Sequence, residues 1–252
     1  MNQQHMAAPG AKFVRHIAAL SSMSGVCLAE LLVGLAAGAI VLTATLETFN
    51  IVHRHVTKQE RDLAHQQDLR LGMGVFEQEA RLASAESIAT AAPDEFLFLA
   101  NIHAQRTATT SAVAPGQSVL AVQDGSGWGE GKTVAVCVAR MCELHRLSRA
   151  GQRASLTLAE PVESPFPAGA SVELRNRVLY YTKRDEQGSL RLMRMVDGGA
   201  GTLVAGLERV RFSYRDNRGR ATSEPSHVKR VVVEIESSRF AHTVVREVGL
   251  RS

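Results

Sequence analysis

The chain has 252 residues, of which 45% are hydrophobic and 21% are charged. This composition is typical of a folded protein and excludes a disordered or repetitive chain, and the length allows one modest globular domain with a long appended segment. The 29 Lys and Arg residues nearly balance the 25 Asp and Glu residues, so the net charge of +4 gives no reason to expect nucleic-acid binding.

The most apolar stretch of the chain begins near its amino terminus. Residues Val26 to Leu46 contain 21 residues and a single charge, Glu30. At ~1.5 Å per residue a helix of this length crosses a hydrocarbon core of ~30 Å. The sequence therefore predicts a transmembrane helix. A secretory signal peptide fits poorly, because its apolar region is shorter and is not interrupted by an acid.

Glu30 is the residue of this segment that most needs a partner. A charged side chain within a bilayer costs at least ~2.5 kcal/mol, so an intramembrane acid is a functional group by default. A free amine at Val26 would have a pKa near ~7.7 to 8 and would be a natural counter-ion for Glu30 of an adjacent helix. The alternative is an ordinary membrane anchor in which Glu30 is solvated near the headgroups.

Gly25, Val26, Glu30 and the following Leu31–Val33 resemble the processing site of type IV prepilins and pseudopilins. The resemblance implies that prepilin peptidase cuts after Gly25 and methylates the amine of Val26, and that Glu30 docks the subunit. Val26 replaces the usual Phe and Cys27 the usual Thr. The resemblance also supplies the orientation, with a periplasmic carboxyl-terminal domain, because basic residues flank the apolar segment on both sides.

Two further features of the predicted helix concern packing. Gly34 and Gly38 form a small-xxx-small pair that permits close approach of another helix, although such pairs also occur by chance. Helical spacing of apolar residues continues from Val52 to Leu82 and predicts one helix to about Glu86, whose second half lies on a sheet. Gly72 and Gly74 weaken this prediction and mark a candidate kink.

From Pro93 onward, short apolar or alternating runs separated by turn residues predict antiparallel strands. Val210, Phe212 and Tyr214 share one face, as do Val231, Val233 and Ile235. Asp216–Gly219 is a predicted turn. The predicted strands are Glu95–Ala100, Gln117–Gln123, Thr133–Val138, Ser155–Ala159, Ser171–Leu174, Val178–Thr182, Ser189–Val196, Leu207–Arg215, Val228–Glu236 and His242–Val248.

The expected fold class is α+β and pilin-like, with one long amino-terminal transmembrane and amphipathic helix packed on an antiparallel β-sheet head. The expected divisions are a leader at residues 1–25, a transmembrane half-helix at 26–48, an amphipathic half-helix and linker at 49–92, and a β-rich periplasmic head at 93–252. The later part of the chain is loosely similar to PilW-type minor pilins, and J-type pseudopilins of type II secretion share much of the same layout.

Other motifs point away from catalysis. Residues 125–133 look like a phosphate-binding loop, but the first glycine of that motif would fall on Ser126, so a hairpin loop with Trp128 as a contact residue at its tip is expected. Cys137 and Cys142 with His145 leave a zinc shell incomplete. The two cysteines are a candidate disulfide, with unpaired buried thiols as the alternative. No catalytic, metal or cofactor motif is recognised, so we expect no enzyme.

These expectations describe a minor pilin that is processed by prepilin peptidase and then enters or primes a type IV pilus. Its expected partners are the peptidase, other major and minor pilins, the assembly platform and, before assembly, the inner membrane. The alternatives are a J-type minor pseudopilin, a single-span anchor protein, and a tip binding or adhesion module. The last rests on the loop around Trp128 and on the basic strand with Arg209, Arg211 and Arg215.

Overall fold

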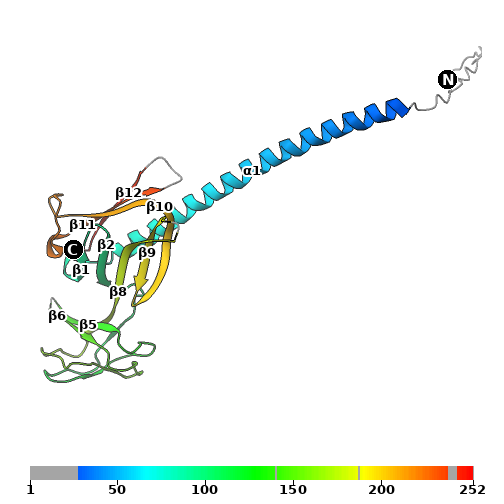
Figure 1. The fold of residues 1–252 in the computed structure, drawn as a ribbon. Helices are drawn as coiled ribbons and strands as arrows, with labels where there is room; N and C mark the ends of the chain where they lie inside the picture. Colours follow the sequence, from blue (N-terminus) through cyan, green and yellow to red (C-terminus); the bar gives the residue numbers. More distant parts are fainter. Residues whose placement is uncertain (1–27, 140, 187, 238–242, 252) are drawn as a thin grey trace, which may run out of the picture. The chain divides into compact units, whose positions relative to one another are not determined.

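A computed structural model describes residues 28–139, 141–186, 188–237 and 243–251 (Figure 1). The chain divides into two compact units, one that ends at Lys58 and one that begins at Gln59. Helix α1 (Leu28–Ala80) runs from the first unit into the second, and every other element belongs to the second unit.

The last part of α1 packs on the sheet through one face. Leu69, Met73, Phe76 and Ala80 are buried there, at the three- and four-residue spacing of a helical stripe. This confirms the predicted amphipathic packing for residues 69–80, whereas the earlier apolar residues Val52, Val56 and Leu63 are exposed. The helix runs through Gly72 and Gly74 without interruption, so neither glycine ends or melts it.

The helix ends at Ala80, six residues before the predicted end. A turn at Arg81 and Leu82 leads into the short 3₁₀-helix η1 (Ala85–Ser87). The Ser87 hydroxyl donates to the Ser84 carbonyl and accepts from the Ser84 N–H, both at 2.9 Å. These side-chain hydrogen bonds compete with the helix ladder, which explains the early end.

Seven strands form the main antiparallel sheet, in the order β1-β2-β8-β9-β10-β11-β12. Predicted inward residues Val210, Phe212 and Tyr214 of β10, and their counterparts on β11, are buried as expected. The strands are β1 (Ile88–Ala91), β2 (Glu95–Ala100), β8 (Ser171–Arg184), β9 (Leu190–Val196), β10 (Gly199–Arg215), β11 (Arg230–Ser237) and β12 (Thr243–Gly249).

Aromatic side chains fill the core between α1 and this sheet. Phe76 of α1 meets Tyr180 edge to face with ring centroids 5.0 Å apart, and it also contacts Phe96 and Phe212. Contacts of this geometry stabilise beyond the area they bury. Helix and sheet are therefore joined by a continuous apolar core.

The structure differs from the predicted strands at several places, and β10 begins at Gly199 rather than at Leu207. The two predicted strands Ser171–Leu174 and Val178–Thr182 are one continuous strand, β8, which is shared by the main sheet and a second group of strands. Strands β1, β3 (Arg106–Ala108) and β6 (Met141–Arg146) were not predicted. Their short length or high polarity hides the period-two pattern, and pairing with longer neighbours determines them.

The second group of strands closes into a small barrel, which contains residues 106–175. Strand β8 pairs with β3 and β5 (Thr133–Val138), and β5 pairs with β6. Residues 146–148 bond to 157–159, β7 (Ser155–Thr157) pairs with β4 (Val119–Ala121), and residues 121–123 bond back to 108–110. This closes the ring, and closure removes the exposed strand edges that promote aggregation.

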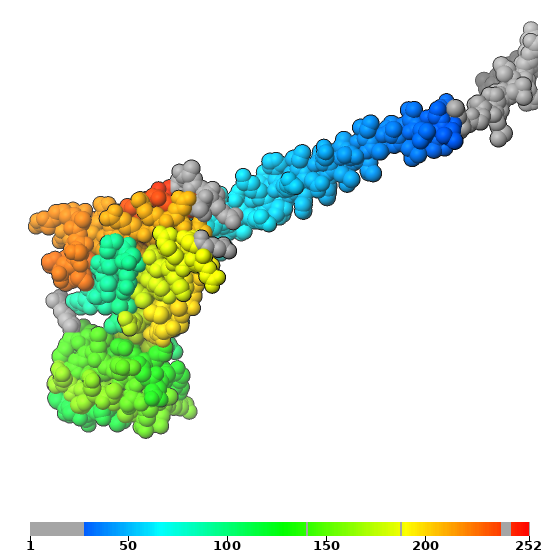
Figure 2. Space-filling model, in the orientation of Figure 1, coloured from blue at the N-terminus to red at the C-terminus, as the bar shows by residue number. Residues whose placement is uncertain are grey.

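The barrel has a hydrophobic core of its own. The members include Trp128, Phe166, Leu120, Leu156 and Val172, and none of them belongs to the core under α1. Figure 2 shows the green part of the chain, which contains the barrel, gathered into a separate lobe. The second unit thus contains two cores that share strand β8.

Candidate functional site

The candidate site from the sequence is the amino-terminal part of α1. Gly25 and Val26, the predicted cleavage and methylation residues, lie outside the described residues, as does Cys27. The description starts at Leu28, and Glu30 lies in the first helical turn.

The surface of this part of the helix is apolar and is not covered by the rest of the described chain. Its 18-residue apolar window is long enough to cross a membrane, and none of that window is buried. Leu28 is 77% exposed and Ile40 is 70% exposed, and Val33, Leu35, Val41, Leu42 and Phe49 are similarly open. Each such side chain gains about 1.5 to 3 kcal/mol when it leaves water, so this surface favours lipid or another protein.

The threonine hydroxyl groups of this segment are hydrogen-bonded within the helix, so they can be placed in an apolar environment. Thr43, Thr45 and Thr48 each donate to the backbone carbonyl four residues earlier, at 2.8, 2.7 and 2.8 Å. A donor that is satisfied within its own helix needs no water. The whole stretch from Leu31 to Leu46 can therefore enter lipid or a helix bundle without leaving a hydroxyl donor unpaired.

Gly34 and Gly38 lie one turn apart on this helix. If a Cβ atom is added to either glycine, no atom of the described chain lies within 4 Å of it, apart from the nearby backbone of the same helix. Their open surface allows another helix to approach closely. The packing role predicted for these two glycines remains a prediction, since its partner is a different chain.

In the second unit, a buried polar cluster joins α1 to the sheet. The carboxylate of Glu79 accepts a hydrogen bond from the Tyr180 hydroxyl at 2.5 Å and a two-pronged contact from the Arg194 guanidinium. Burial and the neighbouring Glu79 charge raise the pKa of Tyr180, and the hydrogen bond to Glu79 raises that of Arg194. The Arg194 guanidinium pairs with the Glu79 carboxylate and the neutral Tyr180 hydroxyl adds a hydrogen bond, which is how a buried ion is tolerated.

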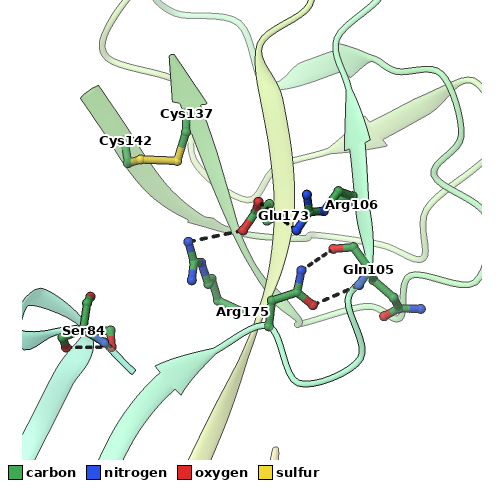
Figure 3. Close-up of polar contacts among 9 residues, drawn as sticks. Ser84, Gln105, Arg106, Cys137, Cys142, Glu173 and Arg175 are labelled. Atoms are coloured by element: carbon green, nitrogen blue, oxygen red, sulfur yellow. Dashed lines mark hydrogen bonds and ion pairs between the residues drawn. A yellow bond between two sulfur atoms is a disulfide. The ribbon is translucent and has the colours of Figure 1, made fainter. Parts of the chain in front are cut away.

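Cys137 and Cys142 lie opposite each other on β5 and β6, and the structure joins them in a disulfide with Cα atoms 4.2 Å apart. The bond lies beside a cleft that also receives Ser84, Glu173 and Arg175 (Figure 3). His145 is buried and pairs with Glu143 at 3.0 Å. Within the described ranges, no group of three or more His, Cys, Asp and Glu side chains is placed to hold a metal.

The predicted contact role of Trp128 is wrong. Trp128 is 4% exposed and belongs to the barrel core, because the glycine-rich loop folds inward and the Gly151 N–H bonds to the Trp128 carbonyl at 2.7 Å. Arg209, on the predicted basic strand, is paired with Glu236 at 2.7 Å. Both observations weaken the features on which a tip binding module was based.

Comparisons with protein-family models, with curated proteins and with solved structures give no match for this chain.

Proposed function

We propose that this protein is a pilin-like subunit, most similar to a minor pilin. The observation that carries the proposal is the exposed apolar stretch of α1 from Leu28 to Leu46, whose one charged residue, Glu30, follows Gly25 by five residues. In this proposal the leader is removed after Gly25. Glu30 of one subunit then pairs with the Val26 amine of another.

The apolar surface supports the proposal through a simple exchange of environments. Before assembly the segment from Leu28 to Leu46 lies in the inner membrane, and after assembly it packs against the helices of other subunits. Lipid contact is replaced by protein contact, and Gly34 and Gly38 let the backbones approach. A charge pair in this apolar setting is scarcely screened, so it fixes the axial stagger of neighbouring helices.

The partners under this proposal are prepilin peptidase, other major and minor pilins and the inner-membrane assembly platform. A J-type pseudopilin of a type II secretion system would use the same residues in the same roles. A tip binding module is less favoured, since its aromatic contact residue is buried in the barrel.

Mass spectrometry of the membrane-extracted protein tests this proposal. In a host with working prepilin peptidase we expect a chain that begins at Val26 and carries one methyl group on its amine. Gly25→Leu should leave the chain at full length, because a bulky side chain hinders the bond to be cut. The matched control Gly10→Leu, within the leader, should be trimmed normally. Recovery of Met1 from mature wild-type material would exclude the proposal.

A further inference from the structure

The cleft beside the disulfide has a volume of about 780 Å³ and lies between the barrel and the main sheet. The walls of the cleft come from the β5–β6 hairpin, from β8 and from the segment around Ser84. Lys229 and Arg251 also line it. Both cysteines line this cleft. Figure 3 shows the disulfide on the β5–β6 hairpin together with Arg175 and the Ser84 segment, which line the same cleft.

The two cysteine residues lie at the surface of the barrel and are not part of its core. Cys142 is exposed and Cys137 is half-buried, and neither residue belongs to the barrel core. The disulfide spans a sequence separation of only 5, across a hairpin that backbone hydrogen bonds already pair from Thr133 to Arg146. A disulfide that closes a short loop adds less to the free energy of unfolding than one that closes a long loop. The bond is therefore reachable and dispensable for the fold.

Three cations and two acids line the cleft. Arg175 pairs with Glu173 at 3.4 Å, and Arg106 lies 3.8 Å from the same carboxylate, so Glu173 is shared by two cations. Lys229 and Arg251 have no ion pair with any other described residue, and Glu86 is the other acid of the lining. Cations near a cysteine stabilise its thiolate and make the disulfide easier to reduce.

We propose that the Cys137–Cys142 disulfide is a redox-exchange site that a dithiol reductant, either a small dithiol or a dithiol oxidoreductase, reduces in the folded protein. The inference does not depend on the proposed pilin function. A thiolate of the reductant attacks Sγ of Cys142, the more exposed of the two residues, the disulfide bond breaks, and Cys137 leaves as a thiolate that takes a proton from water. The second thiolate of the reductant then attacks the mixed disulfide and releases Cys142. The protein gains two electrons, and the reductant becomes a disulfide.

Reduction changes the constraint on the first residues of β6. Their backbone pairs with β5 on one side, and on the other the Glu143 carboxylate accepts from the N–H groups of Glu163 and Ser164 at 2.9 and 2.7 Å. On the side away from β5, residues 141–145 therefore lack a continuous set of backbone hydrogen bonds. The backbone hydrogen bonds that close the barrel on this side begin at Arg146. Loss of the disulfide frees this segment locally and leaves the rest of the barrel closed.

The test uses the full-length Cys27→Ser protein in detergent, so that only two cysteines remain. The protein is incubated with dithiothreitol without denaturant, and free thiols are trapped with iodoacetamide and counted by mass spectrometry. We expect both cysteines to be labelled at least about a hundredfold faster than the protein unfolds globally, as measured by pulse proteolysis under the same conditions. Labelling at the rate of global unfolding would overturn the proposal.

Hydrogen exchange of the reduced protein tests the structural consequence. Amides of residues 141–145 should exchange at least about tenfold faster than in the oxidised protein, whereas amides of β2 should not change. Unchanged exchange in β6 would overturn the release of this segment. A Cys137→Ser/Cys142→Ser variant should fold and show the same fast exchange, and its failure to fold would show that the disulfide is required.

Charge variants test the role of the cleft. Lys229→Gln/Arg251→Gln should slow reduction by about twofold or more, since two positive charges that line the same cleft as the released thiolates are lost. The control Lys183→Gln/Arg184→Gln removes two cations at the end of β8, outside the cleft, and should leave the rate unchanged. Equal rates in the two variants would overturn the role of the cations.

Discussion

Glu30 and Asp197 are single carboxylates in opposite settings. Glu30 lies in the exposed, apolar part of helix α1. Asp197 lies in the turn between β9 and β10 and accepts hydrogen bonds from Lys132 Nζ at 2.5 Å, Asn176 Nδ2 at 2.8 Å and the Arg177 N–H at 2.8 Å. The first is the acid to which we assign docking, and the second joins the barrel to the main sheet.

Glu30→Ala is expected to reduce incorporation into filaments by at least about tenfold, since loss of one buried ion pair removes more than about 1.4 kcal/mol. Membrane insertion should be unaffected, because the variant is more apolar than the wild type. Immunoblots of sheared filaments and of membrane fractions measure the two quantities. The control Glu47→Ala removes the next acid of the same helix and should incorporate normally. Normal filament levels of Glu30→Ala would contradict the docking role.

Asp197→Asn is expected to destabilise the barrel by about 1 kcal/mol at neutral pH, because the charged acceptor for Lys132 is lost. Burial alone would raise the pKa of Asp197, but the hydrogen bonds from Lys132 and Asn176 outweigh it and hold the pKa below its usual range. A lowered pKa stabilises the fold above the unfolded value of about 3.9, and this contribution is lost as the pH falls through the folded value.

The difference between Asp197→Asn and wild type should therefore shrink in strongly acidic solution. Trp128, which is the only tryptophan and lies in the barrel core, reports unfolding in urea at each pH. Lys132→Met supplies a double-mutant cycle, and the coupling should be positive at pH 7 and near zero below the folded pKa. If the coupling energy between Asp197 and Lys132 does not change with pH, the ion pair is not what stabilises the wild type over Asp197→Asn.

At the scale of elements, Gly72 and Gly74 form a matched pair on one helix. A Cβ atom at Gly72 would lie 2.6 Å from Val204 Cγ2 and 3.0 Å from the Leu203 carbonyl oxygen, whereas one at Gly74 would meet no atom within 4 Å. Gly72→Ala should destabilise the helix–sheet core by about 1 to 3 kcal/mol. Gly74→Ala should stabilise it by about 1 kcal/mol, since alanine is the better helix former. Thermal unfolding followed by far-UV circular dichroism measures both, and changes of the same sign would contradict the close approach at Gly72.

The elements that could be predicted are those whose signal is local. The long helix, β2, β5 and the buried faces of β10 and β11 follow from the spacing of apolar residues over a few turns or residues. Closure of the barrel could not be predicted, because it depends on bonds between segments such as 146–148 and 157–159, neither of which has a clear period. Trp128 was misjudged for the same reason, since its glycine-rich neighbours suggest an exposed loop and its core partners lie far along the chain.

The candidate site divides in the same way. A lone acid in an apolar helix is visible in the sequence, and so is the pair of cysteines that the structure bonds. The cleft beside that pair is assembled from the Ser84 segment, β8, Lys229 and Arg251, which the sequence separates by more than 160 residues. Only the fold brings these charges to the disulfide.

At the scale of the second unit, two cores share one strand but little else, so each is expected to respond to its own substitutions. Phe76 is buried under the main sheet and Phe166 in the barrel. Phe76→Ala should destabilise the helix–sheet core by about 3 to 5 kcal/mol and shift the Trp128 fluorescence transition in urea much less. Phe166→Ala should do the reverse, with the larger change in fluorescence and the smaller change in the helical circular dichroism signal. If both probes shift together in both variants, the unit unfolds as one cooperative body, and strand β8 with the Lys132–Asp197 pair couples the cores more strongly than their separate packing implies.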